Sequence, residues 1–131
     1  MSRGSATAIA VIAAVVLPAC SSHRAPRTPS VVPAAGTVVV GVASWYGPGY
    51  HGKRTSSGER FDQDELTAAH ANWAFGTKVR VTLLSTGKSI VVRINDRMPR
   101  RDRVVDLSRG AARKIGLIGP GTGRVRLEVI G

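Results

Sequence analysis

The sequence is poor in the residues that build disulfides and metal sites. Cys20 is the only cysteine among 131 residues, which excludes an internal disulfide bond. The three histidines are scattered, and neither an HxxxH pair nor a cysteine pair supplies the spacing of a metal site. We therefore expect no metal and no other cofactor.

Acidic residues are also scarce. Eight Asp and Glu stand against 19 Lys and Arg, which gives a formal net charge of +11. Residues 37–131 alone carry 16 of the basic and all 8 of the acidic residues, so their net charge is 16 − 8 = +8. This imbalance predicts an anionic surface or ligand close to the protein.

The chain has no apolar run long enough for a comfortable membrane span. Arg3 precedes the uncharged run "ATAIAVIAAVVLPAC", which has the length of the apolar region of a signal peptide. The remaining length suffices for one modest domain. We predict that residues 1–19 are an export signal and lie outside the folded domain.

The end of this run is more specific than its middle. The stretch from Leu17 to Cys20, "LPAC", resembles the lipobox of bacterial lipoproteins, whose cysteine is lipidated and becomes the mature N-terminus. An ordinary signal peptide with a stray cysteine is the alternative. Ser21 resembles the signal for outer-membrane delivery, so the resemblance implies a lipid-anchored protein on the periplasmic face of the outer membrane. An exported chain does not meet nucleic acid, which we exclude as a partner.

The rest of the chain divides into a linker and a domain. Residues 20–36 are rich in Ser, Pro, Ala and Thr, a composition that predicts a flexible tether behind the lipidated cysteine. From residue 37 onward, apolar and polar residues alternate as in β-strands. We expect strands near residues 38–45, 66–69, 78–84, 89–95, 104–105 and 124–130, with a hairpin turn at 85–88.

Only residues 108–116 read as a clear helix, with Ser108 as a possible N-cap and Gly116 as a possible C-terminal stop. Six short strands with one or two short helices indicate a mainly β fold. The strands are cationic and partly apolar, and closing them into a small barrel would hide their edges.

The stretch "IVVRINDRMP" (residues 90–99) ends an apolar strand with a carboxylate. Strict alternation places Asp96 on the same face as Ile90, Val92 and Ile94. A buried carboxylate without partners is too costly, so we expect Asp96 at the rim of a cleft, where it could act as a general acid. A turn-capping role is the alternative.

Five motifs occur in the order seen in the rare lipoprotein A family, whose domain is a double-psi β-barrel. They are "GVASWYGPGYHGKRTSSGERFD", "LTAAH", "FGTKVRVT", "VVRINDRMP" and "VVDLSRGAA". The resemblance implies a lytic transglycosylase that cleaves the MurNAc–GlcNAc bond of peptidoglycan and closes a 1,6-anhydro ring on MurNAc. It also implies Asp96 as the essential acid and then base, with Glu59 and His70 supporting it.

Each supporting residue also has a simpler interpretation. Glu59 could be a solvated turn residue, and His70 could only satisfy backbone groups at the end of a strand. Tyr46 and Trp45 are our candidates for substrate binding, because strand patterning seldom buries two adjacent aromatic residues and an exposed ring stacks on sugars. We also assign Arg97 to substrate binding.

Several residues outside this set receive other interpretations. We interpret His51 as a loop residue and Asp106 of "VVDLS" as a structural residue that caps or bonds to backbone. Met98 stands where the family usually has glycine, and we expect it to reshape the cleft.

Many family members also carry a C-terminal peptidoglycan-binding domain, which we do not expect here because the last strand ends near Gly131. Two functions remain as alternatives to the enzyme: a non-catalytic, expansin-like module that binds or loosens the wall, and a structural envelope lipoprotein.

Overall fold

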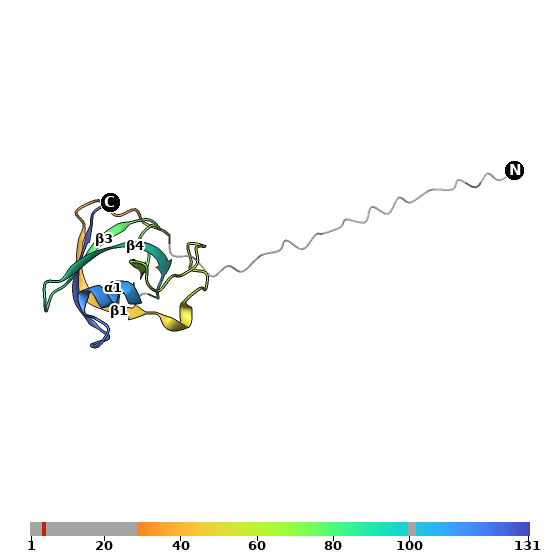
Figure 1. Cartoon of the computed structure of the whole chain (residues 1–131). Helices are drawn as coiled ribbons and strands as arrows, with labels where there is room; N and C mark the ends of the chain where they lie inside the picture. Colours follow the sequence, from red (N-terminus) through yellow and green to blue (C-terminus); the bar gives the residue numbers. More distant parts are fainter. Residues whose placement is uncertain (1–3, 5–28, 100–101) are drawn as a thin grey trace.

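Six strands of the domain close into a barrel in the order β1-β5-β2-β4-β3-β6 (Figure 1). The computed structural model describes residue 4 and residues 29–99 and 102–131. Apart from residue 4, the predicted signal peptide, Cys20 and the tether up to residue 28 lie outside these residues. The elements are β1 (Val38–Tyr46), η1 (Pro48–Tyr50), β2 (Thr67–His70), β3 (Lys78–Leu83), β4 (Ser89–Arg97), β5 (Arg103–Ser108), α1 (Arg109–Ile115) and β6 (Gly123–Val129).

The pairing of the strands confirms the predicted fold class, a mainly β, six-stranded double-psi barrel with short helices. Strands β1 and β5 pair in parallel, as do β2 and β4, and the four other pairings are antiparallel. The predicted hairpin joins β3 to β4, with Thr82 opposite Ser89. Its turn contains Gly87, whose φ of 77° is left-handed and therefore suits glycine.

The core follows from the alternation of the strands. In β3 and β6 every second residue is buried, as the sequence predicts, and the residues between them face solvent. The core is completed by residues of β4, β5 and α1 and the segment after it, among them Val92, Ile94, Val105, Leu107, Ile115 and Leu117. Burial of these side chains drives closure of the barrel.

The predicted helix is also confirmed. The hydroxyl of Ser108 accepts a hydrogen bond from the Ala111 N–H at 3.2 Å, and Gly116 ends the helix with a φ of 79°. Strand β5, for which we expect two residues, has six and includes Asp106. In the described part of the chain, no helix is long and apolar enough to cross a membrane.

The described part of the predicted tether lies against the barrel. Val31 forms an isolated parallel bridge with Trp73, and its N–H donates to the Asn72 carbonyl oxygen at 2.7 Å. Gly36 donates to the Val129 carbonyl oxygen at 2.7 Å. Gly36 thus lies against the end of β6, whereas Ser30 lies beside Arg97 at the end of β4, where the candidate site forms.

Candidate active site

Strand β4 contains one residue more than β2 where the site forms. Ala68 pairs with Ile94, whereas the next residue, Ala69, pairs with Asp96, so Asn95 is the extra residue of a β-bulge. Ile94 and Asn95 are both buried, with exposed fractions of 0% and 1%. The prediction that Asp96 continues the core face of Ile94 is therefore wrong. The bulge shifts the alternation by one position and turns Asp96 to the opposite face.

Asp96 shares this outer face with a second carboxyl. Asp106 pairs with Ser44 in β1 and with Ala69 in β2, and Ala69 pairs with Asp96. Residues paired directly across strands point to the same face of a sheet. We call this set the carboxylate row: Ser44, Asp106, Ala69 and Asp96. Two strand spacings place the Cα atoms of the two aspartates about 10 Å apart, with a small alanine between them.

Asp96 is half-buried, and its oxygens accept three hydrogen bonds. Oδ1 accepts from the backbone N–H groups of Ser56 and Arg97, both at 2.9 Å, and Oδ2 accepts from the Tyr46 hydroxyl at 3.3 Å. Among the described residues, Asp96 takes part in no ion pair. The Asp96 carboxyl is thus fixed in place by hydrogen bonds and not by an ion pair.

Tyr46 is a positioned hydroxyl group next to Asp96. Its ring stacks on Phe61, with 4.6 Å between centroids, and meets the edge of Tyr50 at 5.7 Å. Burial raises the pKa of Tyr46 far above its usual value, and the negative charge of Asp96 adds to the shift. Tyr46 is therefore a neutral phenol that can donate to Asp96. Because Phe61 covers one ring face, a sugar could stack only on the other, and that role stays a prediction.

Glu59 is held as an anion beside the bulge. Nη1 of Arg93 donates to both of its oxygens, at 2.9 and 3.1 Å, and Nδ2 of Asn95 donates to Oε1. The hydrogen bond from Asn95 lowers the pKa of Glu59, burial opposes this shift, and Arg93 strengthens it. An ionised Glu59 cannot donate a proton, but it fixes the residue that re-aims Asp96. Its predicted role in activity remains untested.

His70 ends β2 beside Arg97, its pairing partner in β4. Its Nδ1 accepts from the backbone N–H groups of Asn72 and Trp73 at 3.2 and 3.1 Å. The ring stacks on Trp73 at 4.0 Å with an interplanar angle of 8°. Nδ1 is thus an acceptor, which places the proton of the neutral ring on Nε2. His70 does satisfy backbone groups, and a further part in catalysis stays a prediction.

Asp106 lies within β5 and does not cap the helix, because Ser108 fills that role. Its Oδ1 accepts from the Ser44 hydroxyl at 2.7 Å, and that hydroxyl accepts from Nη1 of Arg103 at 2.9 Å. Burial raises the pKa of Asp106, Ser44 and Arg103 oppose the shift, and the charge of Asp96 supports it. The sequence signal for this half-buried acid is a carboxyl inside the apolar run "VVDL", and its interpretation as a cap does not hold.

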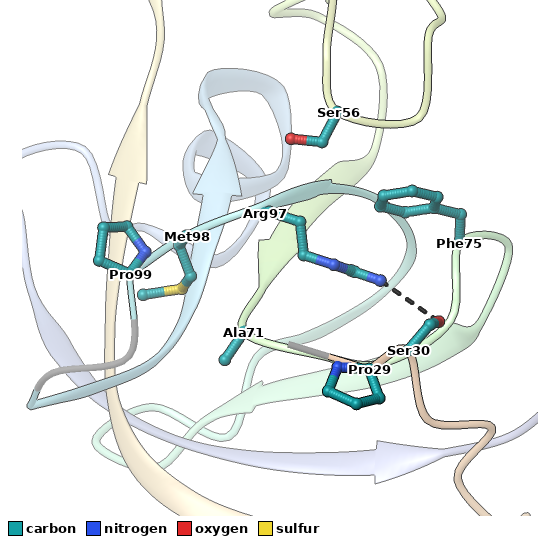
Figure 2. Close-up of a pocket in the computed structure, with 8 residues that line it drawn as sticks. All are labelled: Pro29, Ser30, Ser56, Ala71, Phe75, Arg97, Met98 and Pro99. Carbon is teal, nitrogen blue, oxygen red and sulfur yellow. Dashed lines mark hydrogen bonds between the residues drawn. The ribbon is translucent and has the colours of Figure 1, made fainter. Parts of the chain in front are cut away.

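A cleft of about 710 Å³ is lined by Ser56 and Arg97, the two residues whose backbone N–H groups bond to Asp96 (Figure 2). It is lined by Pro29, Ser30, Ser56, Ala71, Phe75, Arg97, Met98 and Pro99. Met98 and Pro99 also line a smaller cavity of about 170 Å³ that includes Asp106. Met98 thus contributes to both spaces, and the expectation that it reshapes the cleft stays a prediction.

The other two predicted substrate-binding residues differ in their surroundings. Trp45 pairs with Leu107, a core residue, so its ring points away from the carboxylate row and packs against the core. Arg97 lies in the cleft, and its guanidinium group stacks over the ring of Phe75 at 4.1 Å. Arg97 and Ser56 both line this cleft, whereas Trp45 is not among the residues that line it. A role of either residue in substrate binding stays a prediction.

Residues 51–65 form a loop that contacts the row at Asp96. Its Ser56 reaches Asp96, and Ser57 donates to the Asn95 carbonyl oxygen at 3.3 Å. His51 is a loop residue, as expected, and its Nδ1 accepts from the Gln63 N–H at 3.2 Å. In the described ranges, no three His, Cys, Asp or Glu side chains gather as metal ligands do.

Comparison with known proteins matches this domain to one family. The family described as "Lytic transglycolase" matches residues 38–127. A probable endolytic peptidoglycan transglycosylase RlpA of Synechocystis sp. is 59% identical over 91 residues, which cover 69% of this chain and 28% of that protein. The endolytic peptidoglycan transglycosylase RlpA of Campylobacter jejuni is 52% identical over 104 residues, or 79% of this chain and 38% of that protein. The chain therefore spans about a third of the length of these relatives.

Solved structures share the fold at lower identity. A Streptomyces papain inhibitor has a TM-score of 0.64 at 22% identity and covers 77% of this chain and 100% of its own. A Clavibacter michiganensis expansin has a TM-score of 0.60 at 20% identity and covers 72% of this chain and 51% of its own. At this identity the likeness concerns the fold alone.

Proposed function

The chain belongs to the lytic transglycolase family, and from this premise we propose that it is a peptidoglycan lytic transglycosylase. It would cleave the glycosidic bond between MurNAc and GlcNAc and leave a 1,6-anhydro ring on MurNAc. The names of its relatives, endolytic peptidoglycan transglycosylases, support this substrate. The observation that carries the proposal is Asp96, which accepts three hydrogen bonds and forms no ion pair among the described residues, and whose backbone donors Ser56 and Arg97 line an open cleft.

In the proposed reaction, Asp96 acts first as acid and then as base. Its carboxyl proton passes to the glycosidic oxygen as the C1–O bond breaks, and the resulting carboxylate takes the proton of the C6 hydroxyl as the O6–C1 bond forms. Asp96 ends with one proton, as it began, and no water is consumed. The contact with Tyr46 persists in both states, because a phenol oxygen can donate to a carboxylate or accept from a carboxylic acid.

The other predicted residues would support this step indirectly. Glu59 keeps Asn95 in the bulge and so keeps Asp96 on the outer face. His70 would fix the end of β2 beside Arg97. Tyr46 orients Asp96 and, on its open ring face, could meet a sugar.

We also propose where the protein works. The lipobox-like "LPAC" supports lipidation of Cys20, and Ser21 supports the periplasmic face of the outer membrane. Peptidoglycan is then within reach of a short tether. Mass spectrometry of the protein from a Gram-negative host would detect the lipid on Cys20, and an unmodified, uncleaved chain would contradict the anchor.

The test of the activity is a digest of purified glycan strands. Wild-type protein should release fragments that end in 1,6-anhydro-MurNAc, and Asp96→Asn should lower the yield by roughly a hundredfold or more, because loss of general acid–base catalysis has about this effect. Asp64→Asn, which removes an exposed carboxylate of a 3.6 Å ion pair with Arg113, is the matched control and should retain activity.

The outcome also decides between the alternatives. If neither wild type nor Asp96→Asn yields anhydro products but both sediment with sacculi, the protein is a binding module and the enzymatic proposal fails. Reducing-end products without the anhydro ring would indicate a hydrolase that uses water.

A further inference from the structure

The cleft next to the site contains an arginine, Arg97, that forms no ion pair among the described residues. Nη1 of Arg97 donates to the Trp73 carbonyl oxygen at 2.7 Å and, more weakly, to the Asp96 carbonyl oxygen at 3.5 Å. Nη2 donates to the Ser30 hydroxyl at 3.4 Å (Figure 2). Arg93, Arg113 and Arg126 form ion pairs in the described residues, and Arg97 does not.

A guanidinium group carries five N–H donors, and these three bonds use Nη1 and one hydrogen of Nη2. Nε–H and the second hydrogen of Nη2 have no acceptor in the described part of the chain. Two such donors match the two oxygens of a carboxylate, and charge-assisted pairs of this kind are strong and directional.

The guanidinium group of Arg97 is fixed in position by its neighbours Phe75 and Trp73. The guanidinium lies 4.1 Å from the centre of the Phe75 ring, which is 42% exposed, and the Trp73 carbonyl fixes its other side. Partial burial removes water from the charge and lowers the pKa of Arg97, and the negative charge of Asp96 opposes this shift. Arg97 is ionised at neutral pH. A preorganised, partly desolvated cation that faces a cleft is suited to bind an anion.

We propose that Arg97, stacked on Phe75, forms a carboxylate-binding subsite that seats a muramic acid unit of the glycan strand beside Asp96. This inference rests on the proposed function and adds the chemical class that the subsite recognises. The carboxylate could be the free lactyl group of a strand without stem peptides or a carboxylate of the stem peptide itself. Both present the same two oxygens to the guanidinium.

The first experiment changes only the substrate. Stem-free strands, stem-bearing strands, and both after carbodiimide amidation of their carboxylates are offered to the inactive Asp96→Asn protein, and binding is measured by sedimentation. Amidation should weaken binding by roughly tenfold to a hundredfold, because it removes a charge-assisted bidentate pair. The stem-free or stem-bearing strand that shows this loss identifies the source of the carboxylate. Equal binding of native and amidated strands in both arms would overturn the proposal.

The second experiment changes the protein. Arg97→Gln should bind native strands as weakly as the unchanged protein binds amidated ones, and amidation should have no further effect on it. Arg97→Lys keeps the positive charge but lacks the paired donors, so its affinity for native strands should lie between those of the unchanged protein and Arg97→Gln. This intermediate affinity would show that the loss in Arg97→Gln does not come from misfolding. Arg124→Gln removes an exposed cation from β6 and serves as the charge-matched control. If Arg97→Gln and Arg124→Gln lose the same affinity, the subsite does not exist.

Binding by the inactive protein separates this proposal from the proposed activity. Wild-type protein that makes no anhydro products but discriminates native from amidated strands would retain the subsite and lose the enzyme. In an active enzyme, Arg97→Gln should raise KM on native strands more than it lowers kcat, because the contact is made before and during the reaction.

Discussion

At the scale of single residues, the site separates two carboxyls by their surroundings. Asp96 accepts three hydrogen bonds, two of them from residues that line the large cleft, whereas Asp106, also half-buried, lines the smaller cavity and accepts a hydrogen bond from the Ser44 hydroxyl. Burial raises the pKa of Asp106, so its charge costs free energy in the folded protein. This cost has a consequence for stability.

Replacing Asp106 by asparagine should stabilise the protein at neutral pH. Because the pKa of Asp106 is higher in the folded than in the unfolded state, wild type loses stability as the pH rises from the unfolded pKa through the folded one. In the Asp106→Asn variant the side chain carries no charge, and its amide oxygen can still accept from the Ser44 hydroxyl. The Tm of the variant should therefore exceed that of wild type at about pH 7, and the difference should vanish near about pH 3, where the aspartate is protonated in both the folded and the unfolded state.

Thermal unfolding followed by circular dichroism across this pH range checks the sign. Asp102→Asn, which removes an exposed carboxylate on the rim of the smaller cavity, is the control and should change Tm little at any pH. A variant at position 106 that is less stable than wild type at neutral pH would show that Ser44 and Arg103 outweigh burial.

At the scale of elements, the loop of residues 51–65 is fastened to α1 where Gly110 has no side chain. Gly110 donates to the Gln63 carbonyl oxygen at 2.7 Å, and a Cβ atom at this position would lie 2.5 Å from the Asp64 carbonyl oxygen. The Ser108 hydroxyl donates to the Glu65 carbonyl oxygen at 2.5 Å. These contacts hold the loop whose Ser56 reaches Asp96.

Gly110→Ala should therefore destabilise the domain by about 1–3 kcal/mol, the usual cost of overpacking. Alanine ordinarily stabilises a helix relative to glycine. A loss of stability would therefore identify the clash of the new Cβ atom with the Asp64 carbonyl as its cause. Gly119→Ala, where a Cβ atom would meet nothing within 4 Å, is the control. Urea unfolding measures the free energy of unfolding of both variants. Equal stability of Gly110→Ala and wild type would show that the loop moves to admit the Cβ atom without loss of stability.

Much of the fold could be predicted at this scale because alternation marks strands whose two faces differ. Strands β3 and β6 and the ends of α1 follow the sequence closely. For strand β5 the prediction is too short. The charged residues Arg103 and Asp106 flank its short apolar stretch, so the sequence pattern marks only residues 104–105 as a strand. The bulge could not be predicted, since nothing in the identity of Asn95 indicates that β2 supplies no partner for it. The contact of Ser56 with Asp96 spans 40 residues, and only the folded loop brings them together.

At the scale of the whole molecule, residues 37–131 carry a net charge of +8, and their substrate in the proposed function is anionic. Part of the affinity should come from this overall field and not from a single contact. Binding of the Asp96→Asn protein to glycan strands should then weaken steadily as NaCl increases from about 0.05 to 0.5 M, because the Debye length falls below about 10 Å.

Sedimentation with glycan strands at several salt concentrations measures this dependence. Neutral chitin oligosaccharides provide the control ligand, and their binding should depend little on salt. Affinity for glycan strands that stays constant over the whole range would show that the excess of cations plays no part in recognition.

The extra residue in β4 has a meaning for anyone who wishes to move this site into another barrel. Whether Asp96 lies on the outer face or among the Val and Leu side chains of the core depends on whether the number of residues between the hairpin and the end of the strand is odd or even. If only the side chains were copied, without the extra residue, the carboxyl would point into the barrel interior. The spacing itself is a functional part that must travel with them.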